Sequence, residues 1–191
     1  MTNDSTTNSK KKLFEFARHQ NGLFTTKQAE EAGYSRKHHS YHVKAGNWVR
    51  ELRGIYRLAQ FPQDDEDVQL TLWYLWSRDR NETPQGVYSH DTALRIYELS
   101  DIMPEKLHMT VPKNFRRFHD LPKILTIYKN DLERIDLRLM RGFATTTPKK
   151  TLLDLIQSEH FERSIIMDIF EEALQKGMLN PKEEEEIRKL L

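Results

Sequence analysis

The chain of 191 residues contains no cysteine. This absence excludes disulfides, thiol nucleophiles, iron–sulfur clusters and cysteine-ligated zinc, and it fits a reducing compartment. The longest apolar stretch, residues 68–76, is far shorter than the roughly 20 residues that span a bilayer. Residues 1–9 are polar and lack the apolar core of a signal peptide. We therefore expect a soluble, cytoplasmic protein with no membrane partner, whose residues 1–9 form a disordered tail.

Net charge is also nearly absent, since 30 lysine and arginine residues oppose 29 acidic ones. The balance hides an asymmetry: residues 1–61 carry a net charge of +6, which leaves −5 for residues 62–191. A basic module followed by an acidic one indicates an anion-binding N-terminal domain and a C-terminal domain with another task. Pro62 and the acidic run after it predict a boundary between domains at 10–61 and 62–191.

Residues 10–61 have the element order of a winged helix-turn-helix. Apolar spacing predicts a helix over residues 10–19, and Thr25 with Gln28 forms a capping box for a second helix. Ser35 is the candidate N-cap of a third helix, which Gly46 ends. Two β-rich runs, 48–52 and 55–58, then flank Arg53-Gly54, a two-residue hairpin signal. The second helix of such a motif enters the DNA major groove.

The third helix has one basic face when its residues are placed at about 100° each. His39, His42 and Val43 fall on the side predicted to pack inward. The other side of the helix carries predicted DNA-binding side chains, namely those of Arg36, Lys37, Ser40, Tyr41 and Lys44. The hairpin adds three arginines to the predicted interface, Arg50, Arg53 and Arg57. The alternative is a solvated basic face on an ordinary surface helix.

The histidines of this helix have two interpretations. His38 and His42 are four residues apart and could hold a metal ion, but no cysteine or nearby acid completes the site. We favour partly buried or phosphate-facing histidines, and expect no metal and no cofactor. Protonation near pH 6 would then add positive charge to the helix and make DNA affinity depend on pH.

Residues 62–191 are predicted to be mixed α and β, so that the fold class is α+β with an N-terminal winged helix-turn-helix. A tryptophan-containing apolar stripe predicts a core helix over residues 65–77, and strand-like stretches cover 106–111, 124–128 and 135–140. Residues 145–147 are assigned to a loop before a helix that starts near Pro148. The basic loop after the first strand is either a second phosphate contact or a solvated turn, through Lys113, Arg116 and Arg117.

Catalytic motifs are missing, so we predict that the chain is not an enzyme. It has no glycine-rich phosphate loop, no zinc-protease or serine-hydrolase motif, and no metal-nuclease motif. Ser89, His90 and Asp91 include the residue types of a catalytic triad. Consecutive side chains are expected to diverge, however, and adjacency in sequence is not triad geometry.

A series of short motifs runs along residues 16–155. In the winged region they are Thr25-Thr26-x-Gln28-Ala29, Gly33, Ser35-Arg36, Gly46 and Arg50-x-x-Arg53-Gly54-Ile55-Tyr56. Further along they are Ser89-His90-x-Thr92-Ala93-Leu94, His108-x-Thr110-Val111-Pro112 and Thr146-Thr147-Pro148-x-x-Thr151-Leu152-Leu153-Asp154-Leu155. Together these motifs resemble the AbiEi-type antitoxins of abortive-infection systems. His39 departs from the resemblance, because a leucine is expected at that position of the third helix.

The resemblance implies an antitoxin of a bacterial type IV toxin–antitoxin system, active in phage defence. Such a protein represses its own operon by placing the winged helix on inverted repeats of its promoter, in double-stranded DNA. It also opposes a nucleotidyltransferase-like toxin, without necessarily contacting it. The alternative is a non-catalytic interaction module whose C-terminal domain docks a partner protein.

Overall fold

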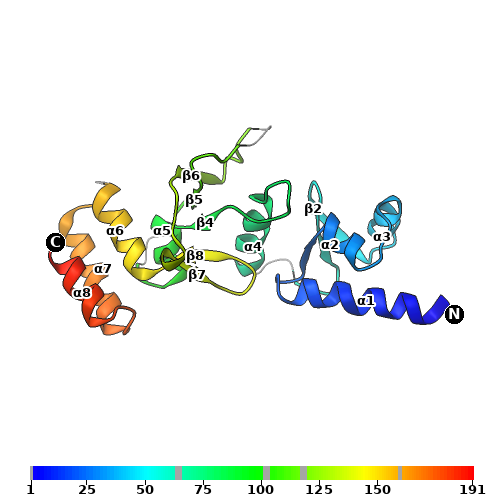
Figure 1. Ribbon diagram of the computed structural model, residues 1–191, viewed down its shortest axis with the longest axis horizontal. Helices are drawn as coiled ribbons and strands as arrows, with labels where there is room; N and C mark the ends of the chain where they lie inside the picture. The colour runs from blue at the N-terminus through cyan, green and yellow to red at the C-terminus, as the bar shows by residue number, and fades with distance from the viewer. Residues whose placement is uncertain (1, 63–65, 101–103, 117–119, 159–160) are drawn as a thin grey trace. The chain divides into compact units, whose positions relative to one another are not determined.

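The computed structural model describes residues 2–62, 66–100, 104–116, 120–158 and 161–191. The chain divides into two compact units, one of residues 1–85 with 139–143 and one of residues 86–138 with 144–191 (Figure 1). The predicted boundary at Pro62 is therefore too early. The helix that follows residues 63–65, which lie outside the described ranges, belongs to the first unit because its apolar side chains pack there.

The first unit contains a three-stranded antiparallel sheet with helices packed around it. Its strands β1 (Leu23–Thr25), β3 (Ile55–Leu58) and β2 (Trp48–Leu52) lie in that order. Its helical segments are α1 (Thr2–Arg18), α2 (Thr26–Glu31), the 3-10 turn η1 (Arg36–His38), α3 (His39–Lys44) and α4 (Glu66–Trp76). The order of elements confirms the winged helix-turn-helix predicted for this part of the chain.

Local chemistry accounts for the turns of this unit. The Thr25 hydroxyl accepts the backbone N–H of Gln28, and the Gln28 side chain accepts that of Thr25, which is the predicted capping box of α2. The hairpin between β2 and β3 turns at Gly54, whose φ of +75° is a conformation that glycine adopts without strain.

The helix α1 begins earlier than predicted. It extends back to Thr2, so residues 2–9 are helical rather than a disordered tail. Apolar periodicity marks only the turns that pack against a core, and here those turns carry Leu13 and Ala17. A helix that continues past its packed turns leaves no such signal in the sequence.

Two apolar clusters hold the first unit together. Leu13 and Ala17 of α1 pack with Phe24, Ala29 and Trp48 on one side of the sheet. A second cluster joins β1 and β3 to α4 through the buried residues Leu23, Ile55, Val68, Leu72 and Leu75. The apolar stripe of α4 is thus a core stripe, as predicted.

The second unit is built on a five-stranded sheet of order β6-β5-β4-β8-β7. The strands are β4 (Val87–Tyr88), β5 (Leu107–Val111), β6 (Leu125–Lys129), β7 (Leu137–Leu139) and β8 (Ala144–Thr146). β4 pairs antiparallel with β5 and parallel with β8, and β5 pairs parallel with β6. The mixed sheet confirms the α+β assignment, but β8 corrects the prediction of a loop at residues 145–147, since Thr145 and Thr146 are buried beside β4.

Helices complete the second unit. They are α5 (His90–Ile96), the 3-10 turn η2 (Arg134–Asp136), α6 (Pro148–Ser158), α7 (Arg163–Gln175) and α8 (Pro181–Arg188). α6, α7 and α8 gather at the C-terminal end of the chain, drawn from yellow to red in Figure 1. Buried residues of α5 and these three helices share one apolar core, which includes Leu94, Leu155, Phe170 and Ile187.

Candidate nucleic-acid interface

The helix formed by η1 and α3 presents a basic face to solvent. The predicted residues Arg36, Lys37, Ser40, Tyr41 and Lys44 are all exposed, and Tyr41 keeps 65% of its surface accessible. Within the described part of the chain, the three cations make no ion pair or hydrogen bond through their side chains. The face predicted from helical spacing therefore exists and its charges are available, while its contact with DNA stays a prediction.

The opposite side of the same helix packs inward, as the spacing predicted. His39 is only 3% exposed, and His42 and Val43 are half-buried. His39 Nε2 lies 3.2 Å from the Tyr34 carbonyl oxygen, and its ring packs against Trp48. An imidazole thus occupies the position where the resemblance led us to expect leucine, and it still forms part of the core.

Trp48 is the residue that ties this helix to the wing. It begins β2, is 3% exposed, and meets Phe24 edge-on at 4.9 Å between ring centroids. The His42 ring stacks on it at 4.6 Å, and Tyr34 meets it at 5.1 Å. Each such aromatic pair contributes about 0.5–1.5 kcal/mol beyond its buried area. A rigid aromatic support therefore lies directly behind the basic face.

The inward location of His42 changes its titration. Burial lowers the pKa of the His42 imidazole, and electrostatic interactions with His39, His38 and Lys10 lower it further. His42 is therefore a poor source of the positive charge predicted for this helix near pH 6. Across the described residues, no group of three or more histidine, aspartate or glutamate side chains is placed to hold a metal ion.

The wing carries two of its three arginines on the surface. Arg50 in β2 and Arg53 at the hairpin turn are exposed. A register irregularity between Arg50 and Leu52 bends the strand just before the turn. These two side chains remain candidates for phosphate contacts beside the basic helix.

Arg57, the third arginine of the wing, is buried. Its residue is 3% exposed, its Nε lies 2.7 Å from Glu51 Oε1, and its guanidinium also donates to the Phe61 carbonyl oxygen. Alternation along β3 places Arg57 on the same face as Ile55, the face that packs on α4, where its charge requires an internal partner. We therefore remove Arg57 from the predicted interface and assign it to the support of the wing.

Arg78 is a residue that sequence reasoning missed. Its guanidinium donates to the carbonyl oxygens of Gly54 and Leu75 and pairs with Glu82. It thereby fastens the turn of the wing to the C-terminal end of α4, while the Thr26 N–H donates to the same Gly54 oxygen. No short motif marks this role, because the partners lie far apart along the chain.

The predicted basic loop that carries Lys113 and Arg116 belongs to the second unit. Lys113 and Arg116 are exposed, and Lys113 Nζ lies 3.9 Å from Asp131 Oδ2, an open ion pair that contributes little. Arg117 lies outside the described residues. The choice between a phosphate contact and a solvated turn stays open for this loop.

The Ser89–Asp91 segment forms a buried network. Contrary to the expectation that neighbouring side chains diverge, His90 Nδ1 lies 2.9 Å from Ser89 Oγ, because His90 has a φ of +51°. The His90 ring stacks on Tyr128 at 3.8 Å, and Asp91 Oδ1 lies 3.8 Å from His108 Nδ1. Ser89 is completely buried, so its hydroxyl is not placed to attack a substrate that comes from solvent.

Comparisons with known proteins agree with this architecture. The chain is similar to the crystal structure of the RV2827C protein from Mycobacterium tuberculosis, with a TM-score of 0.52 and 14% sequence identity. That likeness covers 95% of this chain and 71% of the other, and at this identity it concerns the fold. No curated protein sequence matches the chain. None of the described helices is both long and apolar enough to cross a membrane.

The family comparison concerns the winged unit itself. Residues 11–59, which span the C-terminal part of α1 and all elements from β1 to β3, match a family model described as a transcriptional regulator, AbiEi antitoxin. The match supports a DNA-binding antitoxin and points to a regulator rather than an enzyme. Residues 11–59 thus match the AbiEi antitoxin transcriptional regulators, the family that the motifs resemble.

Proposed function

We propose that this chain represses its own operon by placing η1 and α3 in the DNA major groove, and that it opposes a nucleotidyltransferase-like toxin. The observation that carries the DNA-binding part is the exposed, unpaired basic face of Arg36, Lys37 and Lys44, backed by the aromatic cluster around Trp48. Charged groups that are carried on a rigidly held helix lose little freedom when they meet phosphate.

Each element has a definite role in this proposal. The exposed residues of η1 and α3 contact base edges and the flanking phosphates, while Arg50 and Arg53 of the wing contact the phosphate backbone. One copy reads one half-site. An inverted repeat therefore binds two copies, whose centres are spaced by about 34–36 Å or a multiple of it.

The test is fluorescence anisotropy of a labelled duplex from the gene's own upstream region, with a shuffled duplex as control. Affinity for the native duplex should exceed that for the shuffled one and fall steeply with salt, with a log–log slope of about −0.9 per phosphate contact. Equal binding to both duplexes would contradict sequence-specific recognition of DNA.

Three variants locate the interface. Lys44→Gln should weaken binding to both duplexes and reduce the salt slope by about 1, whereas Arg36→Gln should cost about 1–3 kcal/mol on the native duplex alone. Lys182→Gln removes the same charge from an exposed position of α8 and should change neither quantity. Unchanged binding in the first two variants would mean that another surface contacts DNA.

The antitoxin part of the proposal has its own test. Co-expression with the neighbouring gene product of the operon should relieve the growth arrest which that product causes alone. Arg36→Gln with Lys44→Gln should abolish repression of a promoter reporter but retain the relief of arrest, because the second unit is unaltered. Failure of the wild-type chain to relieve arrest would contradict the antitoxin assignment without touching the DNA-binding result.

A further inference from the structure

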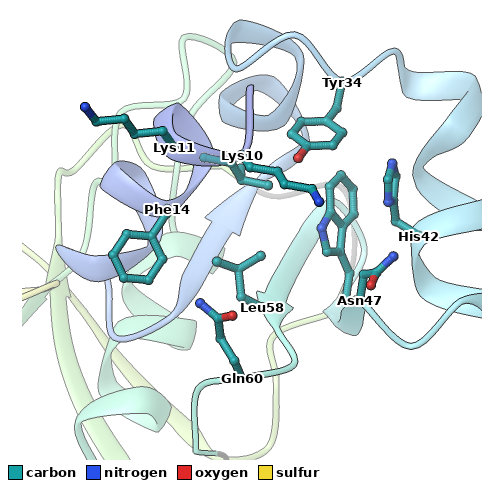
Figure 2. A pocket seen from close by; sticks show the side chains of 10 residues that line it. Lys10, Lys11, Phe14, Tyr34, His42, Asn47, Leu58 and Gln60 are labelled. Carbon is teal, nitrogen blue, oxygen red and sulfur yellow. The ribbon is translucent and has the colours of Figure 1, made fainter. Parts of the chain in front are cut away.

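A cavity of about 470 Å³ lies within the first unit, behind the wing and the basic helix (Figure 2). Its volume falls in the range of small-molecule sites, about 300–1,000 Å³. It is bounded by α1 on one side and by Trp48, Leu58 and His42 on the other. The predicted DNA contacts do not use it.

The chemistry of the wall is cationic and aromatic. Lys10 and Lys11 are the charged residues among the ten described side chains that line the cavity, and none of the ten is acidic. Figure 2 shows the Lys10 ammonium group directed toward Trp48, with Tyr34 and His42 nearby. Phe14 and Tyr34 supply accessible ring surface, the buried Trp48 contributes an edge, and Asn47 and Gln60 add polar groups. A flat ring that carries a negative charge complements this wall.

The cavity is on the side of α3 that faces away from the basic surface. At about 100° per residue, His42 lies roughly 160° around α3 from both Ser40 and Lys44 of the exposed face. A DNA backbone lying against Arg36, Lys37 and Lys44 therefore does not reach the cavity. This placement favours a small ligand over a phosphate of the bound duplex.

We propose that this cavity binds a small aromatic carboxylate or aromatic phosphate, with the anion at Lys10 and the ring against Tyr34 at the edge of Trp48, and that occupancy alters DNA affinity. The link to DNA is structural: the Tyr34 ring meets the His42 ring of α3 edge-on at 5.0 Å, and His42 stacks on Trp48 at 4.6 Å, so a ligand seated against Tyr34 pushes on the inward side of the DNA-contacting helix. The second half of the proposal rests on the proposed function, and the first half does not.

The site is tested without DNA by titrating the isotope-labelled full chain with simple probes and following indole N–H signals by NMR. The three tryptophans serve as their own controls, because Trp48 lines the cavity and Trp73 and Trp76 lie on α4. Benzoate or phenyl phosphate should shift the Trp48 signal saturably. Benzamide, which keeps the ring without the charge, and inorganic phosphate, which keeps the charge without the ring, should each bind at least about tenfold more weakly.

Two charge-matched variants locate the anion. Lys10→Gln should weaken binding of the anionic probe about tenfold. Lys27→Gln removes a charge that is also exposed from α2, outside the cavity wall, and should leave the affinity for the anionic probe within about twofold of the wild-type value. Absence of saturable shifts with both anionic probes overturns the proposal, as does equal binding of benzamide or an equal loss in both variants. A Lys10-dependent Trp48 shift produced by duplex DNA alone also overturns it.

The regulatory half is tested by repeating the anisotropy titration with the bound probe at saturation. The dissociation constant for the native duplex should change at least about fivefold, the lower end of typical coupling between two sites. An unchanged constant overturns the coupling and leaves the site intact. If no duplex binds at all, the proposed function fails, while the NMR titration still decides whether the cavity is a ligand site.

Discussion

Replacement of Arg57 by methionine should destabilise the first unit rather than weaken its contact with DNA. Arg57 is a basic residue of the predicted wing, yet its side chain is 4% exposed and paired with Glu51, whose side chain is 15% exposed. Methionine keeps most of the apolar stem and removes the charge. The variant therefore leaves a largely buried carboxylate without its partner.

The expected magnitude follows from that uncompensated charge. Breaking a buried ion pair from one side typically costs about 3–5 kcal/mol, and Glu51 keeps some access to water, so we expect about 3 kcal/mol. In a unit of this size such a loss lowers the melting temperature by more than about 10 °C. Arg57→Met combined with Glu51→Leu should recover much of the loss, because no charge is then left behind.

Tryptophan fluorescence measures this loss selectively, since Trp48, Trp73 and Trp76 all lie in the first unit. Chemical denaturation of Arg57→Met is compared with that of Arg53→Gln, which removes an exposed arginine from the same hairpin and should stay within about 0.5 kcal/mol of the wild type. The reasoning is refuted if Arg57→Met keeps wild-type stability and instead reduces the salt slope of DNA binding by about 1, the behaviour of a phosphate contact.

Other predictions concern the same unit. Thr25→Ala removes the hydroxyl of the α2 capping box and should lower the free energy of unfolding by about 1 kcal/mol in the same fluorescence assay, whereas Ser40→Ala, at an exposed position of α3 in the same unit, should not. Because the pKa of His42 is lowered in the folded state, the unfolded chain binds more protons at acid pH, and stability should be full above about pH 6.5 and decline as pH falls through the folded pKa. A pH series of melting curves should show this decline in the wild type and a shallower one in His42→Gln, and parallel curves would contradict the assignment. Arg78→Gln should release the turn at Gly54, visible as faster amide hydrogen exchange at Thr26, and unchanged exchange there would argue against an anchoring role.

Local signals in the sequence determined much of the winged unit. The capping box at Thr25, the turn at Gly54 and the 3.6-residue spacing of the third helix each depend on residues a few positions apart. Local propensity and side-chain geometry are therefore enough to predict them. The same spacing separated the exposed Arg36, Lys37 and Lys44 from the inward His39, and the motifs around these residues led to the family that residues 11–59 match.

Long-range packing decided the rest. Whether Arg57 faces DNA or an internal carboxylate depends on what packs against each face of β3, and a strand of four residues does not reveal those neighbours by itself. The same is true of α4, which resembles the start of a second domain until its apolar stripe is seen to pack on Leu23 and Ile55. The cavity beside Trp48 is the clearest case, because its wall collects side chains from α1, α3 and β3. Only the tertiary structure brings side chains so distant in sequence to one place, since their contacts are set by the packing of whole helices and strands.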